Sequence, residues 1–184
     1  MNNPILEAAR TLALSVPRAS QIKSADLVAA GACTQAAFDT AFADHATFQR
    51  ELANRLFSDA REAVIQATAG MQSGLAQILK AFTTYLDYNL SNPALQDLAH
   101  VIQFQPEGYE ALQRMEIGVA LVAQADVQAM GASHVAARAR LLTTLAVFTV
   151  RAEFKAKKKL LDMREALLDL CRLCVKTAPD AAAQ

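Results

Sequence analysis

Apolar side chains recur every three to four residues along almost the whole chain, and no strand-like alternation of useful length interrupts them. The stretch 75–86 is typical, because its large apolar residues fall on one face of a helix. They are Leu75, Ile78, Leu79, Phe82 and Leu86. The pattern predicts an all-α fold of about nine helices.

Residues that favour helix starts and ends divide this pattern into segments. The predicted N-caps are Asn3 (followed by Pro4), Ser24, Thr34, Asp44 and Ser133. Pro17, Gly31, the Gly70–Gly74 turn, Pro93, Pro106 and Gly131 mark the breaks between helices. The fourth helix should reach about Thr68, the eighth about Lys157 and the ninth about Lys176. The small residues of 178–184 predict a frayed tail.

The segment 26–42 has the layout of a helix-turn-helix. A short apolar helix ends in a turn at Gly31, and Thr34 can cap a second short helix. In that second helix we expect Phe38 and Phe42, with Ala37 and Ala41, to face inward at i, i+4 spacing. The other side of the helix would then be free to enter a DNA major groove.

Together with its neighbours, this segment resembles the tetracycline-repressor (TetR) family of bacterial regulators. The similar residues are Ile5-Leu6-Glu7-Ala8-Ala9, Asp26-Leu27-Val28, Thr34, Phe38 to Phe42, and Phe48 and Leu52. They cover about the first 50 residues, and the remainder is similar only in helical layout. The chain departs from the family pattern in the order Gly31-Ala32, in Asp39 where a tyrosine is typical, and in His45 where a lysine is typical.

The resemblance implies a DNA-binding domain over residues 1–48 and a helical ligand-binding and dimerisation domain over residues 49–184. In the second short helix, Gln35 can bridge an adenine edge, Thr34 and Thr40 can donate or accept, and the Ala36 methyl can touch thymine. The full predicted DNA-binding set is Ser24, Thr34, Gln35, Ala36, Thr40 and His45.

Charge does not favour this interface. Residues 1–52 carry four basic and five acidic side chains, whereas affinity for DNA comes mostly from neutralising phosphates. Asp39 would face the phosphate backbone with the wrong sign. Phosphates would therefore depend on backbone amides at helix N-termini, at Thr34 and at the head of the fourth helix.

Apolar residues cover more than one face of both 141–150 and 160–171, which predicts burial nearly all round. A homodimer through the last two helices would supply the second surface, as is usual in the family that the chain resembles. The alternative is a thick monomer core. The helix from Pro106 is expected instead to have one inner face, with Leu112, Met115, Val119 and Val122.

The resemblance also implies that the fourth to seventh helices enclose an apolar cavity, which would bind a small apolar ligand. The large side chains that could line it are Phe82, Tyr85, His100, Phe104, Tyr109 and Met115, with Arg114 as an anchor for an anionic group. Each of these is otherwise an ordinary core or surface residue.

Composition limits the remaining functions. The 184 residues have a formal net charge of zero, and the longest nearly apolar run, 141–150, is half the length of about twenty residues that a membrane span needs. The N-terminal residues do not resemble a signal peptide, and three cysteines give no disulfide framework, so we expect a cytoplasmic protein. No phosphate-binding glycine loop or nucleophile elbow is present, and Cys171-x-x-Cys174 lacks partners for a zinc site.

These observations predict neither an enzyme nor a metal or cofactor. A basic cluster over 151–159, interrupted by Glu153, is expected to be a solvated helix end rather than a second nucleic-acid or lipid site. Two functions are compatible with the chain. One is a dimeric TetR-like regulator that binds operator DNA and responds to a small molecule. The other is a helical ligand-binding or interaction protein that has lost sequence-specific DNA binding.

Overall fold

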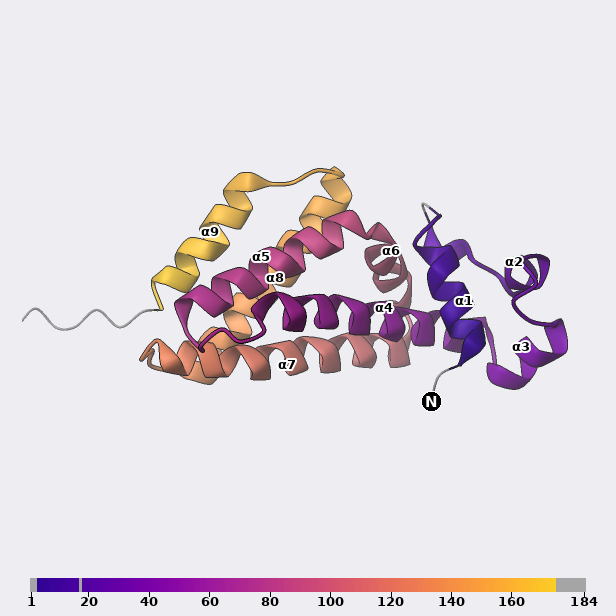
Figure 1. Ribbon diagram of the computed structural model, residues 1–184, viewed down its shortest axis with the longest axis horizontal. Coiled ribbons are helices and arrows are strands. Elements are labelled where there is room, and N and C mark those ends of the chain that lie inside the picture. Colours follow the sequence, from indigo (N-terminus) through magenta and orange to yellow (C-terminus); the bar gives the residue numbers. More distant parts are fainter. Residues whose placement is uncertain (1–2, 17, 175–184) are drawn as a thin grey trace, which may run out of the picture. The chain divides into compact units, whose positions relative to one another are not determined.

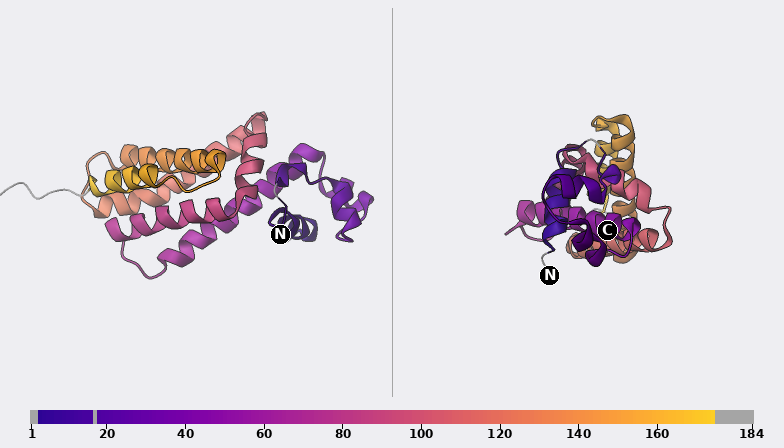
Figure 2. Two further views of the ribbon diagram at one scale, coloured as in Figure 1. Left: turned by 90° about the horizontal axis from the view of Figure 1, so that it is seen from above. Right: turned by 90° about the vertical axis from the view of Figure 1, so that its right-hand side faces the viewer.

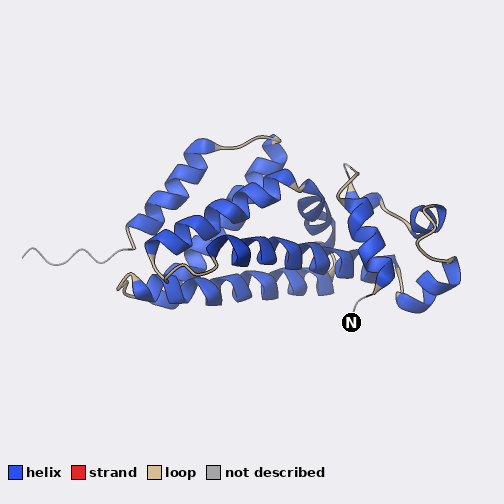
Figure 3. Cartoon of the chain, viewed as in Figure 1, coloured by secondary structure: helices blue, strands red, loops and turns tan. Residues whose placement is uncertain are grey.

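A computed structural model describes residues 3–16 and 18–174, and all regular structure within these ranges is helical (Figures 1 and 3). The elements are α1 Pro4–Ala13, the 3-10 helix η1 Ala19–Gln21, α2 Ser24–Ala29, α3 Gln35–Ala41, α4 His45–Thr68, α5 Leu75–Ser91, α6 Pro93–Ile102, α7 Pro106–Ala129, α8 Val135–Ala156 and α9 Leu161–Arg172. The predicted all-α class with about nine helices is confirmed over the described residues. The predicted end of the last helix at Lys176 and the tail 178–184 lie outside them.

Three helices begin at the side-chain caps that the sequence predicts. The side-chain oxygen of Asn3 accepts a hydrogen bond from the amide of Ile5 at 3.0 Å. Thr34 Oγ1 likewise accepts from the Ala37 amide at 3.2 Å, and Asp44 Oδ1 accepts from the Thr47 amide at 2.7 Å. Each bond satisfies a first-turn N–H that has no partner within its own helix.

Two predicted caps are wrong by one residue. Ser24 is already helical, so Lys23 is the N-cap of α2 and its amide donates to Asp26 Oδ2 at 2.8 Å. Before α8 the cap position belongs to His134 rather than Ser133, and His134 makes no side-chain cap. Its backbone is left-handed, with φ 53°, and this extra residue separates the Ser133 hydroxyl from the first turn.

The chain packs as two compact units. Unit 1 comprises 1–63 and 88–114, and unit 2 comprises 64–87 and 115–184. The boundaries fall inside α4, α5 and α7. This division follows packing and does not test the predicted functional division at residue 48.

The core of unit 1 joins the N-terminal helices to α6. Phe38, Phe42 and Phe48 form a cluster with ring centroids 5.0–5.2 Å apart. Around them lie Ile5, Ala9, Leu27, Leu52, Leu56, Leu95, Leu98 and Ile102. The inward orientation of Phe38 and Phe42 is confirmed, but Ala37 and Ala41 are exposed. Each alanine lies about 100° around the helix axis from the phenylalanine that follows it. Because the helix has only seven residues and buries one narrow side, the alanines remain in solvent.

Gly108 marks a close approach between helices within unit 1. A Cβ atom at this position would lie 2.2 Å from the carbonyl oxygen of Ile102. Glycine is therefore required where the first turn of α7 passes the end of α6.

In unit 2, α9 packs along α8 (Figure 2), and a buried ion pair fixes the connection between them. Arg164 donates from Nε to Glu153 Oε1 at 2.6 Å and from Nη2 to Oε2 at 2.7 Å. Glu153 Oε1 also accepts from the Leu160 amide at 2.8 Å, and Arg164 further pairs with Asp87. Because Glu153 is buried and paired with Arg164, its charge is balanced inside unit 2 rather than by the surface lysines of the 151–159 cluster.

The predicted inner face of α7 is only partly correct. Leu112 is buried and Met115 partly buried, but Val119 is 37% and Val122 67% exposed. The segment 117–123 is apolar on every side, so no polar residue marks which side faces outward. Among the described helices, none combines the length and the apolar character needed to cross a bilayer.

Candidate nucleic-acid interface

The turn between α2 and α3 depends on Gly31. Its φ of 71° is left-handed, which a residue without a Cβ adopts without strain. The chain then turns back sharply, and the amide of Ala32 donates to the carbonyl of Leu27 at 2.9 Å. This arrangement ends α2 and starts α3 only a few residues later.

The predicted base-reading residues lie on the surface of α3. Thr34, Gln35, Ala36 and Thr40 are all exposed, while Phe38 and Phe42 hold the opposite side in the core. Two of the polar groups already have partners within the helix. Gln35 Nε2 donates to Asp39 Oδ1 at 2.7 Å, and Thr40 Oγ1 donates to the Ala36 carbonyl at 2.8 Å. Gln35 would have to leave Asp39 in order to donate to a base.

A surface hollow of about 400 Å³ lies between the start of α2, the side of α3 and the start of α4. Its lining residues are Lys23, Ser24, Gln35, Phe38, Asp39, Phe42, Ala43, Asp44 and His45. The hollow brings together three predicted DNA-binding residues, Ser24, Gln35 and His45. The other three, Thr34, Ala36 and Thr40, are not part of its lining.

Lys23 is a polar residue of this hollow that sequence reasoning missed. Its position directly before a helix start was a usable signal, but Ser24 was assigned the role of cap. Lys23 supplies a positive charge close to α3, whereas Asp39 and Asp44 supply two negative charges to the same lining. The hollow is therefore electrostatically mixed.

The amides expected to bind phosphates are partly occupied. Thr34 Oγ1 takes the Ala37 amide at the start of α3, and Asp44 takes the Thr47 amide at the start of α4. The hydrogen bond from the Thr47 backbone lowers the pKa of Asp44, with a further contribution from the Thr47 side chain. A phosphate at the head of α4 would thus meet an ionised carboxylate.

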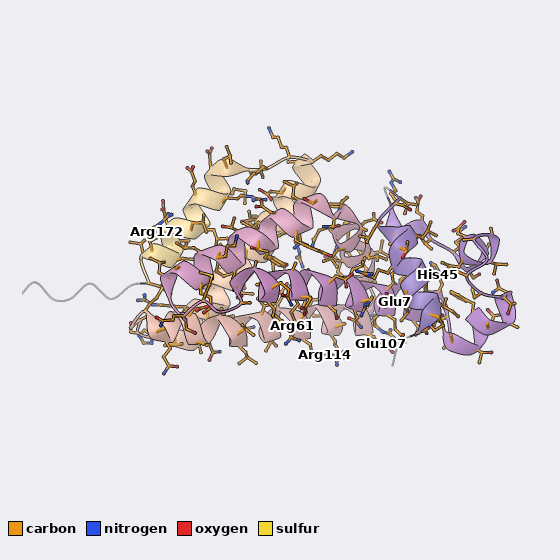
Figure 4. The ribbon with its side chains drawn as sticks, in the orientation of Figure 1. Glu7, His45, Arg61, Glu107, Arg114 and Arg172 are labelled. Atoms are coloured by element: carbon orange, nitrogen blue, oxygen red, sulfur yellow. The ribbon has the colours of Figure 1, made fainter. Side chains whose placement is uncertain are left out.

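Two of the four basic residues of 1–52 are engaged by carboxylates. Arg10 pairs with Asp59 of α4, and Arg50 pairs with Glu107 of α7. His45 is exposed at the first position of α4 (Figure 4), with its ring centroid 5.8 Å from that of Phe48. Lys23, Arg18 and His45 are therefore the side chains most available to phosphates in this region.

The predicted ligand-binding residues are divided between the two units. In unit 2, Phe82 is buried, Met115 is partly buried, and burial raises the pKa of Tyr85 to about 12. The other four predicted ligand-binding residues belong to unit 1 and are all exposed. They are His100, Phe104, Tyr109 and Arg114. The rings of His100 and Phe104 lie 5.7 Å apart, and the Tyr109 hydroxyl accepts from Gln113 at 2.7 Å. A common cavity for all seven residues stays a prediction.

The thiols of α9 and of the turn that follows it lie in an apolar environment. Cys171 and Cys174 are buried in the core of unit 2, and burial raises the pKa of Cys171 to about 12. This thiol is therefore protonated at neutral pH and is a poor nucleophile or metal ligand. Across the described ranges, no group of three or more His, Cys, Asp or Glu side chains is arranged to hold a metal ion.

Comparison with models of protein families, with curated proteins and with solved structures gave no significant match for this chain.

Proposed function

We propose that the protein is a TetR-like transcription regulator that binds operator DNA as a homodimer and is modulated by a small apolar ligand. The observation that supports this best is the division of α3 into two sides. Phe38 and Phe42 anchor one side in the core, and Thr34, Gln35, Ala36 and Thr40 leave the other side exposed. A short helix held in this way can present its polar edge to a major groove.

Base recognition would begin with Gln35 leaving Asp39. Its amide could then donate to and accept from an adenine edge, while Thr40 accepts and the Ala36 methyl contacts thymine. Breaking the exposed hydrogen bond between Gln35 and Asp39 costs only on the order of 1 kcal/mol, because water replaces the lost partner. Lys23 and His45 would contact phosphates, and Ser24 would approach the backbone from the start of α2.

The proposed dimer uses α8 and α9. On α8, Leu141 and Phe148 lie two turns apart on one face and are 57% and 61% exposed. Leu161 and Leu170 of α9 are exposed as well. A ligand would change the affinity for DNA only if it prefers one of two spacings of the paired heads. This function requires no enzymatic activity or cofactor, and a regulator of this kind acts in the cytoplasm.

Selection of bound fragments from random duplex DNA by the full chain tests this proposal. We expect a two-fold related sequence to be enriched, and Gln35→Ala to weaken binding to it by about tenfold, since one bidentate base contact contributes about 1–3 kcal/mol. Gln128→Ala, which removes an exposed glutamine from α7, is the matched control and should bind normally. Enrichment of no sequence would refute operator recognition.

The acidic residues of the hollow favour a second function. Asp39 and Asp44 oppose phosphates, and Arg10 and Arg50 are already paired. These features suit a helical ligand-binding or interaction protein that no longer reads DNA. Titration with a random duplex at several salt concentrations separates the two functions. Affinity that falls steeply with salt supports the regulator, and no binding in dilute salt supports the second function.

A further inference from the structure

The outward side of α7 in unit 2 is apolar over about two and a half turns. The large side chains of this side are strongly exposed: Ile117 by 50%, Leu121 by 60% and Val122 by 67%. Two small residues on the same side, Gly118 and Ala125, are exposed as well. None of the five carries a polar side chain. This part of α7 runs along the lower margin of the ribbon in Figure 1. Large apolar side chains gathered on one helix face usually mark an interaction site.

The four residues 118, 121, 122 and 125 of this face have the same order of small and large side chains in both directions. Gly118 and Ala125 are small, and Leu121 and Val122 between them are large. An antiparallel second copy of α7, related by a two-fold axis between 121 and 122, would place Gly118 against Ala125 and Leu121 against Val122. Small residues at both ends would let the two helices approach closely. A face that matches itself in this way is what a two-fold symmetric contact requires.

The size of the face indicates how tightly two copies would associate. Its exposed apolar area is on the order of 400 Å² per copy. Two copies would bury on the order of 800 Å² in total, less than the ~1,200 Å² at the lower end of stable specific interfaces. By size the contact belongs with weak, transient interfaces rather than with permanent dimers.

We propose that Ile117, Gly118, Leu121, Val122 and Ala125 form a self-association surface at which a second copy of the chain packs antiparallel and from which it dissociates readily. This surface is separate from the α8–α9 contact of the proposed function and involves no DNA. In a protein that already dimerises through α8 and α9, it would join two dimers. In a protein that does not, it would join two monomers.

Sedimentation velocity of the full chain over a wide range of concentrations tests the proposal. We expect the average mass to rise reversibly with concentration. Val122→Glu should weaken this step at least tenfold, because the carboxylate would be buried near the two-fold axis. Ala76→Glu adds the same charge at an exposed apolar position of α5 in the same unit and should leave association unchanged. Since both sites are exposed, circular dichroism should show both variants folded.

Cysteine cross-linking tests the antiparallel order. Of the three free cysteines, Cys33 is partly buried and the other two are buried, so Cys33 is first replaced by alanine. In this background, Val122→Cys should form a disulfide between copies, because the axis passes beside this position. Ala129→Cys should not, since two copies of residue 129 would be about 22 Å apart along an antiparallel pair. Disulfide formation between copies in both the Val122→Cys and the Ala129→Cys variant would contradict the antiparallel packing.

Mass that is independent of concentration, or equal weakening by Val122→Glu and Ala76→Glu, would overturn the self-association surface. Failure of the proposed function would appear differently, as the absence of an enriched duplex while association persists. Conversely, Gln35→Ala should not change the sedimentation of the protein.

Discussion

The buried ion pair between Glu153 and Arg164 should be the most sensitive polar interaction of unit 2. The exposed fractions are 1% for Glu153 and 5% for Arg164, and two parallel hydrogen bonds of 2.6 and 2.7 Å join them. Glu153→Leu would leave the guanidinium buried with only Asp87 beside it, and would leave the Leu160 amide without its acceptor. Removing one partner of a buried pair typically destabilises a protein by 3–5 kcal/mol, so we expect about 3 kcal/mol or more here.

The double variant distinguishes the cost of an unpaired charge from the net contribution of the pair. Arg164→Met alone should also destabilise by about 3 kcal/mol, because it leaves the Glu153 carboxylate buried. Glu153→Leu with Arg164→Met removes both charges and should cost clearly less than the sum of the single changes. We expect a coupling energy of about 2 kcal/mol or more from the double-mutant cycle.

Urea unfolding followed by circular dichroism measures these free energies of unfolding. The exposed pair of Arg172 and Asp169 in the same helix provides a control, and Asp169→Ala should change stability by no more than about 0.5 kcal/mol. Additive single changes, or a cost below about 1 kcal/mol for Glu153→Leu, would show that the reasoning about buried charge is wrong for this site.

Other parts of the chain give further predictions. Gly108→Ala should destabilise by about 1–3 kcal/mol or more in urea unfolding, because its Cβ would collide with the backbone of Ile102. Lys157→Gly should raise the melting temperature by removing left-handed strain of about 1 kcal/mol at φ 51°. Burial raises the pKa of Asp126, although its side chain accepts a hydrogen bond from a backbone amide. Folding therefore favours the protonated carboxyl group. The contribution of this group to the stability of the fold is present at acid pH and is lost as the pH rises through its folded pKa. Asp126→Asn should therefore stabilise the protein at neutral pH and lose this advantage below about pH 4, as thermal melts across pH would show. Asp39→Lys should strengthen binding to any duplex and steepen its salt dependence, whereas unchanged affinity would show that this side chain does not face phosphate.

Local chemistry predicted the helix starts where one side-chain oxygen reaches one amide, as at Thr34 and Asp44. It failed at Ser24 and Ser133, because a shift of one residue depends on backbone dihedral angles that surrounding contacts select. The left-handed backbone of His134 is such a case.

Helical periodicity predicted which segments are helices but not always which side is buried. In α7 the residues around Val122 are apolar on all sides of the helix. The sequence therefore predicts a helix there but does not show which side faces solvent. In the candidate interface, the exposed side of α3 was predictable from Phe38 and Phe42. The pairing of Arg50 with Glu107 was not, because it joins residues far apart in sequence.

The division of the chain has a consequence for work with fragments. No single cut in the chain can release either unit, because each unit consists of two separate segments. A fragment ending at residue 48 would keep Phe38, Phe42 and Phe48 but lose the α6 leucines Leu95 and Leu98 that belong to the same core. Truncation would therefore expose the aromatic cluster to water, and the N-terminal region is expected to keep its shape only within the whole polypeptide.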